Sequence, residues 1–253
     1  MRPSRLPIAL LVLAVFTGCS SSGPEFDPEV QPGVFEFDFE TGRQGWEPIF
    51  VGVPKDKEGG EDLAVNEIES DHRALPDEVE KESKALFAHG FTGTPGLGLF
   101  FRRRVTGLAP GTRYRVSFEV EIASDVGEGC FGTGGSPSNT RIHTVAVPRK
   151  PTRDVKERRL TDVYVFDDEA TAEAMASPTS VLGTIANGLP CKKAHEMGKP
   201  FRLKTLSSEP NFWTVTTGEK GEVWLLVGSI TAFNGKVSLY YNEIIARFEE
   251  ITK

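Results

Sequence analysis

The sequence predicts an all-β fold, a single antiparallel jelly-roll β-sandwich with long loops and at most short helices. The clearest sign is strict alternation of apolar and polar residues along one segment, which buries one strand face and leaves the other in water. Its apolar positions are Tyr114, Val116, Phe118, Val120 and Ile122. Seventeen phenylalanines, 26 glycines and few long apolar helical stripes also favour strands over helices. Residues 34–253 have the length of one large sandwich domain.

Residues 1–18 have the features of a signal peptide. Arg2 and Arg5 precede the apolar stretch Ile8–Phe16, and small residues follow before Cys19. The apolar stretch is shorter than the roughly 20 residues of a permanent transmembrane helix. We therefore expect export and removal of this segment.

The tetrapeptide Phe16-Thr17-Gly18-Cys19 resembles the bacterial lipobox, in which the cysteine takes a diacylglyceryl group and becomes the new N-terminus. The resemblance implies a lipoprotein anchored to a membrane by acyl chains, palmitate among them, at Cys19. Residues 19–33 then form a flexible polar tether. Ser20 after the cysteine resembles the default sorting signal for the outer membrane, which is therefore the expected location. The alternative location is the outer face of the cytoplasmic membrane. An ordinary secretory signal with an incidental cysteine is the alternative.

The charge balance indicates which partners to exclude. Removing residues 1–18 removes two arginines and no acids, which leaves 27 basic against 36 acidic side chains and a formal charge of −9. A surface with this balance argues against a nucleic-acid partner.

Cys130 and Cys191 are the pair that remains once Cys19 is assigned to lipid. Because the exported compartment permits disulfides, we expect these two to be bonded. Closing a loop of about 60 residues would stabilise the fold by roughly 4 kcal/mol on the chain-entropy model. His195 follows Cys191 by four residues, but a zinc site would need further ligands.

The domain opens with an alternating segment, Val34–Glu40. Alternation places three phenylalanines on the core face and the carboxylates of Glu36, Asp38 and Glu40 on the other. Like charges about 7 Å apart repel, and a hard cation such as Ca²⁺ would relieve that repulsion by taking oxygen ligands. A solvated acidic face without a metal is the alternative.

Two predictions concern residues 54–122: a long surface segment and a hairpin. Residues 54–90, rich in charged residues and glycine, are expected to form a long surface excursion with one short helix near 78–87. Residues 99–105 and 113–122 flank a Pro110-Gly111 turn, which predicts a hairpin. That hairpin would place Arg102 and Arg104 near Glu119 and Glu121.

Apolar runs predict further strands after the glycine-rich segment 127–135, which lacks the ending of a phosphate-binding loop. The segment 168–176 is predicted to form a short helix. The expected strands cover residues 141–147, 160–166, 180–186, 201–206, 212–216, 222–231 and 236–248.

Three motifs together resemble the galactose-binding-like jelly rolls that include many carbohydrate-binding modules. They are Phe37–Glu40 with Gly45-Trp46, the turn Gly107–Tyr114, and the closing Tyr240–Ile244. The resemblance implies a structural Ca²⁺ held by Glu36, Asp38 or Glu40 together with Asn242 or Glu243. Such a metal would join the first and last strands and would take no part in catalysis.

The chain is also similar to a group of uncharacterised bacterial lipoproteins and secreted proteins. The similarity lies mainly in Leu99–Phe101, Gly132–Pro137 and Ile185–Gly188. In that group the glycine-rich run continues with Gly-Glu-Ser, whereas Ser138-Asn139-Thr140 stands here. The group implies no particular activity.

An enzymatic alternative rests on Glu36–Glu40, which resembles the Glu-x-Asp-x-Glu strand of retaining endoglucanases with a concanavalin-like jelly roll. Glu36 would be the nucleophile and Glu40 the acid/base. Residues four apart on a regular strand lie about 13 Å apart, whereas a retaining pair needs about 5 Å, so a bulge or strong curvature must intervene.

The sequence therefore favours a lipid-anchored envelope protein that acts as a non-catalytic binding module, with a glycan as the leading ligand. Trp213 is the candidate sugar-stacking residue, because aromatic faces suit the apolar faces of pyranoses. Trp46 and Trp224 are expected to pack in the core. The alternatives are the retaining endo-glycoside hydrolase and a structural or protein-docking lipoprotein.

Overall fold

Alternating apolar and polar side chains turn most of the chain into antiparallel strands, and the fold is the predicted all-β sandwich. The computed structural model describes residues 33–55, 66–79, 82–93, 96–158 and 161–252. The expected signal peptide, Cys19 and all but the last residue of the expected tether lie outside the described residues. The described residues form one compact unit.

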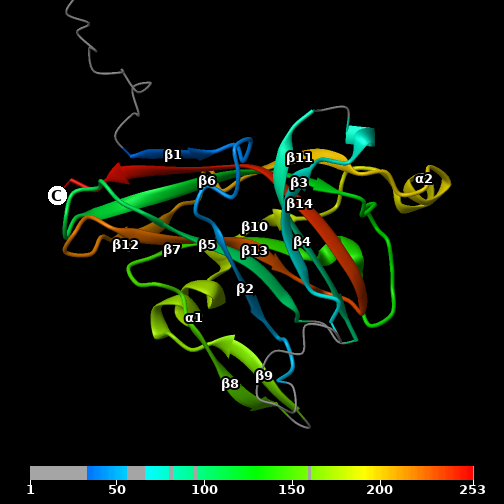
Figure 1. The fold of residues 1–253 in the computed structure, drawn as a ribbon, viewed down its shortest axis with the longest axis horizontal. Coiled ribbons are helices and arrows are strands. Elements are labelled where there is room, and N and C mark those ends of the chain that lie inside the picture. Colours follow the sequence, from blue (N-terminus) through cyan, green and yellow to red (C-terminus); the bar gives the residue numbers. More distant parts are fainter. Residues whose placement is uncertain (1–32, 56–65, 80–81, 94–95, 159–160, 253) are drawn as a thin grey trace, which may run out of the picture. The chain divides into compact units, whose positions relative to one another are not determined.

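The larger sheet has the strand order β11-β6-β14-β4-β3, with β12 continuing along β6 and β1 along β14 (Figure 1). All of its pairings are antiparallel. Its strands are β1 (Val34–Phe37), β3 (Glu69–Ala74), β4 (Lys84–Thr92), β6 (Arg113–Ser124), β11 (Arg202–Ser207), β12 (Trp213–Thr216) and β14 (Gly235–Glu250).

The smaller sheet has the order β10-β7-β13-β5-β2 and is also antiparallel. Its strands are β2 (Glu47–Val51), β5 (Gly98–Val105), β7 (Arg141–Val147), β10 (Val181–Thr184) and β13 (Val223–Ile230). A separate hairpin joins β8 (Arg153–Arg158) to β9 (Thr161–Phe166). The helices are α1 (Glu169–Ala176) and α2 (Cys191–Glu196), with 3-10 turns at Asp77–Val79, Pro137–Asn139 and Pro178–Ser180.

The main core lies between the two sheets and is rich in aromatic rings. Trp46, Phe101, Phe118 and Tyr241 are all buried in it, and the rings of Phe101 and Tyr241 meet edge to face at 5.7 Å. Burying apolar surface stabilises a fold by about 25 cal/mol per Å², so large buried rings contribute strongly to stability. The prediction that Trp46 packs in the core is confirmed.

A second apolar cluster covers the outer face of the smaller sheet. Phe100 and Leu226 are buried there against Ala174 of α1, and the ring of Phe166 from β9 meets Phe100 at 5.4 Å. Trp224 is half-buried at the edge of this cluster, with the Lys150 ammonium 5.1 Å from its ring. The helix and the β8–β9 hairpin therefore shield one side of the sandwich (Figure 1).

Residues 99–105 and 113–122 lie in the strands β5 and β6, but the predicted hairpin between them is wrong. β5 pairs with β2 and β13 in the smaller sheet, whereas β6 pairs with β14, β11 and β12 in the larger sheet. The Pro110-Gly111 turn therefore carries the chain from one sheet to the other. Turn chemistry specifies a change of direction and leaves open whether the next strand pairs with the last one.

The charge pairs expected across that hairpin are absent for the same reason. Arg102 contacts Glu47 of the neighbouring strand β2 at 3.2 Å, and Arg104 contacts Glu222 at 3.6 Å. Both arginines are paired within their own sheet, while Glu119 and Glu121 belong to the other.

The expectation of a surface excursion over residues 54–90 is wrong for its second half. β3 and β4 form an edge of the larger sheet, and Leu86 and Ala88 point into the main core. The described residues of the range 78–87 contain no α-helix: the 3-10 turn Asp77–Val79 precedes β4, which begins at Lys84. Burial of β4 between β3 and β14 outweighs the charged character of the segments around it.

A β-bulge at Asn242 changes which residues of the last strand face the core. Before it, the odd-numbered Leu239 and Tyr241 point inward, and after it the even-numbered Ile244 and Ala246 do so. An extra residue in one strand of an antiparallel pair shifts the alternation in this way. Without the bulge, strict alternation would place Tyr240 and Asn242 on one face with Ile244, whereas in the structure Ile244 shares the core face with Tyr241.

Among the described residues, no helix has the length and apolar character required to cross a membrane.

Candidate functional site

Of the five residues predicted to bind a metal, only Glu40 and Asn242 are brought together by a shared contact, described below. Glu36 is exposed on β1, which pairs antiparallel with β14, so the first and last strands are neighbours. Asp38 is exposed and accepts hydrogen bonds from Gln44 Nε2 at 2.8 Å and from the Glu40 backbone at 3.1 Å. Glu243 is half-buried on β14.

Glu40 and Asn242 meet at the buried hydroxyl of Ser83. Ser83 Oγ lies 2.5 Å from Glu40 Oε1 and 2.8 Å from Asn242 Oδ1, while Asn242 Nδ2 donates to Glu121 Oε1 at 2.6 Å. A serine hydroxyl carries one hydrogen, so it donates to one of the two oxygens at a time. The result is a cluster of oxygen atoms with spare acceptor capacity between the loop after β1 and the bulge of β14.

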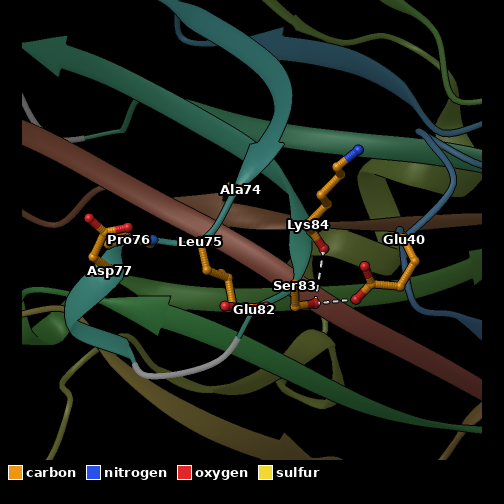
Figure 2. Close-up of a pocket in the computed structure, with 8 residues that line it drawn as sticks. All are labelled: Glu40, Ala74, Leu75, Pro76, Asp77, Glu82, Ser83 and Lys84. Carbon is orange, nitrogen blue, oxygen red and sulfur yellow. Dashed lines mark hydrogen bonds between the residues drawn. The ribbon is translucent and has the colours of Figure 1, made fainter.

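This oxygen cluster adjoins a cavity of about 600 Å³. Figure 2 shows Glu40 and Ser83 reaching toward one another, while Asp77 points away on the opposite side. The lining residues are Glu40, Ala74, Leu75, Pro76, Asp77, Glu82, Ser83 and Lys84. Three carboxylates against one ammonium make the cavity suitable for a cation and unfavourable for an anionic ligand.

If Ca²⁺ binds at Glu40 and Asn242, adding Ca²⁺ at 100 times its Kd is expected to raise the melting temperature by roughly 5–10 °C. Glu40→Gln should remove that shift, because the amide replaces a charged oxygen ligand by a neutral one. Glu36→Gln is the matched control and should keep it. Thermal melts with Ca²⁺ and with chelator measure both, and an identical melt under the two conditions would contradict the calcium site.

The acidic segment does not form the single strand that the endoglucanase resemblance requires. β1 ends at Phe37, and Phe39 takes a positive φ of 59° while its ring is fully buried. Glu36 thus lies in the strand and Glu40 beyond it, hydrogen-bonded to Ser83. The predicted alternation of burial is confirmed through residue 40, since Phe37 and Phe39 are buried in the core while Glu36, Asp38 and Glu40 are exposed, but the strand itself ends at Phe37. The geometry therefore offers no support for a nucleophile and acid/base pair on one strand face.

Strand register shows whether Trp213, the first residue of β12, or its neighbour Phe212 faces solvent. In the pairing of β12 with β6, Trp213 is opposite Val116, and Val215 is opposite Tyr114. Val116, Val215 and Tyr114 all lie in the main core. Cross-strand partners share a face, so Trp213 points inward, where it is half-buried against the core. The preceding residue, Phe212, points outward and is 43% exposed.

Phe212 lies in a groove of about 460 Å³ on the outer face of the larger sheet, a surface that we call the sheet groove. Its ring is covered on one side by the Arg115 guanidinium, 4.6 Å from the ring centre. The sheet groove is lined by Arg115, Ser117, Glu209, Pro210, Asn211, Phe212, Arg247 and Glu249. Its volume is in the range of small-ligand sites.

The charged groups of the sheet groove are available to a ligand. Within the part of the chain that the structure describes, Arg115, Arg247 and Glu249 form no ion pair, although Glu249 is opposite Arg115 in the register of β14 and β6. Glu209 accepts one bond, from Ser117 Oγ at 3.4 Å. The sequence analysis assigned sugar stacking to Trp213. Trp213 and Val215 are two residues apart and therefore share a strand face, so the apolar Val215 could have indicated that Trp213 faces the core and Phe212 faces solvent.

The predicted disulfide between Cys130 and Cys191 is confirmed. It ties the loop after β6 to the start of α2, where the Cys191 backbone N–H also donates a hydrogen bond to the Glu128 carbonyl at 2.8 Å. A cavity of about 440 Å³ adjoins it, and Phe131 projects from this loop with 89% of its surface exposed.

No protein-family model matches the chain, and no curated protein matches it. Among solved structures, the chain is similar to the K1 cleaved adhesin domain of Lys-gingipain from Porphyromonas gingivalis W83, with 10% identity and a TM-score of 0.35 over 87% of this chain and 99% of that one. It is also similar to the enzymatically active domain of tailspike protein 4 of bacteriophage CBA120, with 10% identity and a TM-score of 0.30 over 85% of this chain and 20% of that one. Likenesses at this level carry no inference about function.

Proposed function

We propose that this protein is a lipid-anchored envelope protein whose sandwich domain binds glycans without catalysis, through the sheet groove. The observation that carries the proposal is the outward-facing ring of Phe212, set among guanidinium, carboxylate and amide groups. The anchor is the lipid expected at Cys19, and it places the domain at a membrane surface, which membrane fractionation of the full chain tests.

Sugar rings present an apolar face of C–H groups and a rim of hydroxyls. The Phe212 ring offers a flat apolar surface for the first, with little side-chain entropy to lose. Arg115, Arg247 and Glu249 offer charged hydrogen-bonding groups for the second, which are stronger than neutral ones. Because these groups form no ion pair among the described residues, a ligand would break none to reach them.

A rigid sheet holds one side of the sheet groove in place, while residues 209–212 of the loop before β12 form the other side. Arg115 and Ser117 project from β6, and Arg247 and Glu249 from β14, which is paired with β6 along residues 114–124. Sites on strands are positioned more precisely than sites on loops. This arrangement suits recognition of a ligand whose hydroxyls have fixed relative positions.

Phe212→Ala is expected to weaken glycan binding by about tenfold, since aromatic contacts of this kind contribute about 1 kcal/mol or somewhat more. A glycan array followed by calorimetry on the best ligand measures the change. Phe131→Ala is the matched control, because it removes the other strongly exposed phenylalanine of the described residues and should leave affinity unchanged.

Trp213→Ala gives the contrast that assigns the site. Because Trp213 packs against the core, this change is expected to lower stability as well as binding, whereas Phe212→Ala should lower binding alone. Equal affinities for the Phe212→Ala variant and the wild type would sink the assignment to the sheet groove. Absence of binding to any glycan on a broad array would instead favour a structural or protein-docking role.

A further inference from the structure

Three side chains of the kinds that bind zinc meet where the loop after β6 contacts α2. The Sγ atoms of Cys130 and Cys191 and a ring nitrogen of His195 all lie within 4.8 Å of one another. Cys191 and His195 are four residues apart in α2, so they lie on the same face of the helix. The sulfurs are joined in the disulfide, which leaves no thiolate for a metal in this form of the protein.

Small movements would bring these atoms to the spacing of a tetrahedral zinc site, because no two of them lie more than 4.8 Å apart. With Zn–S about 2.3 Å and Zn–N about 2.0–2.1 Å, ligand atoms on a tetrahedron lie roughly 3.5–4 Å apart. Once the S–S bond of 2.07 Å is broken, the two sulfurs reach that spacing by moving apart by roughly 2 Å. A cysteine and a histidine separated by three residues also fall within the spacings used by structural zinc sites.

The site is accessible to solvent. His195 is exposed, Cys191 is half-buried, and the cavity of about 440 Å³ is lined by Cys130 and His195 together with Asp125 and Lys199. Three protein ligands leave the fourth position of a tetrahedral metal open, as in zinc sites that bind a water or a ligand. Here that position would face the cavity.

We propose that reduction of the Cys130–Cys191 disulfide converts this corner of the protein into a zinc site made of Cys130, Cys191 and His195. A dithiol reductant supplies two electrons and two protons: the S–S bond breaks, two thiols form, and the dithiol becomes its own disulfide. Zinc then binds both sulfurs as thiolates and releases their two protons, while neutral His195 supplies the third ligand. The same two cysteines would thus form a structural cross-link when oxidised and bind a metal when reduced.

The test is titration of the full chain with Co²⁺, a spectroscopic substitute for zinc, before and after reduction with a phosphine that is then removed without air. The reduced wild type is expected to bind one Co²⁺ with thiolate-to-cobalt charge-transfer absorption, and the oxidised protein should show none. His195→Ala keeps both cysteines and should weaken Co²⁺ binding by more than about tenfold, since even outer partners of a metal act on that scale. Lys193→Ala, an exposed residue of the same helix, is the matched control and should bind like the wild type.

Circular dichroism keeps the test decisive if reduction loosens the fold. Added Zn²⁺ should then restore the β-sheet signal of the reduced wild type and fail to restore that of reduced His195→Ala. Equal Co²⁺ affinity, or equal recovery with Zn²⁺, in wild type and His195→Ala would overturn the proposal, as would reduced wild type without charge-transfer absorption.

Discussion

Replacing both bridged cysteines, Cys130→Ser with Cys191→Ser, is expected to lower the free energy of unfolding by about 4 kcal/mol. The bond links residues 61 apart, and a cross-link of that span removes much conformational freedom from the unfolded chain. Backbone hydrogen bonds from Glu128 to Leu189 at 2.6 Å, and from Cys191 to Glu128 at 2.8 Å, hold the same two segments in the folded state. The variant should therefore fold to the same structure with a smaller free energy of unfolding.

Urea denaturation of the wild type and the double variant gives the two free energies directly. The wild type unfolded in the presence of reductant and chelator is the control and should match the double variant, because both lack the cross-link. A difference below about 1 kcal/mol between oxidised wild type and double variant would show that the chain-entropy account fails here.

Acid is expected to destabilise the protein through His143, by about 3 kcal/mol between pH 6.5 and pH 4. His143 is buried on β7 with Nδ1 3.0 Å from Ser180 Oγ, and burial together with the nearby Arg141 charge lowers its pKa from 6.5 to about 4. Above pH 6.5 the ring is neutral in both the folded and the unfolded chain. As the pH falls below 6.5 the unfolded chain takes up a proton that the folded protein does not, so stability falls until the folded ring also titrates near pH 4.

The comparison that isolates this effect is the pH dependence of unfolding for wild type and His143→Gln. The variant cannot titrate at this position, so its loss of stability between pH 6.5 and pH 4 should be smaller than that of the wild type by about 3 kcal/mol. His195→Gln, which removes an exposed histidine, should follow the wild-type curve. Parallel curves for wild type and His143→Gln would refute the assignment of this titration to His143.

Much of the fold follows from local sequence, as two elements illustrate. The segment predicted as a strand over 141–147 is β7 with the same bounds, and the helix predicted over 168–176 is α1, which begins at Glu169. Asp168 caps that helix by accepting a hydrogen bond from the Thr171 backbone at 2.8 Å. Periodicity and capping are short-range signals, so they are readable without the rest of the chain.

The elements that sequence reasoning missed depend on distant partners. β4 looks like part of a charged loop until β14 and β3 are placed beside it, and the bulge at Asn242 appears only in the pairing of β14 with β6. The chain between β5 and β6 was predicted as a hairpin because a Pro-Gly turn has the same sequence whether it joins paired strands or two sheets. Long-range pairing, which propensity does not encode, decided all three.

The candidate sites divide in the same way. The disulfide could be predicted by elimination, because it needed only the count of cysteines and the expected compartment. The resemblance implied only that Glu36, Asp38 or Glu40 lies near Asn242 or Glu243, while the shared contact of Glu40 and Asn242 with Ser83 required the fold. Phe212 was missed because the larger ring of Trp213 drew the assignment one residue away, onto the buried face of β12.

The most direct test of the central claim is chemical-shift mapping of the isotope-labelled protein with the glycan that binds best on the array. Backbone amides of Arg115, Phe212 and Arg247 are expected to shift together and saturate with a single Kd, while those around Phe131 and Ser83 keep their chemical shifts. Shifts that cluster at the disulfide loop or around the cavity of Glu40, with the sheet groove unmoved, would contradict the claim.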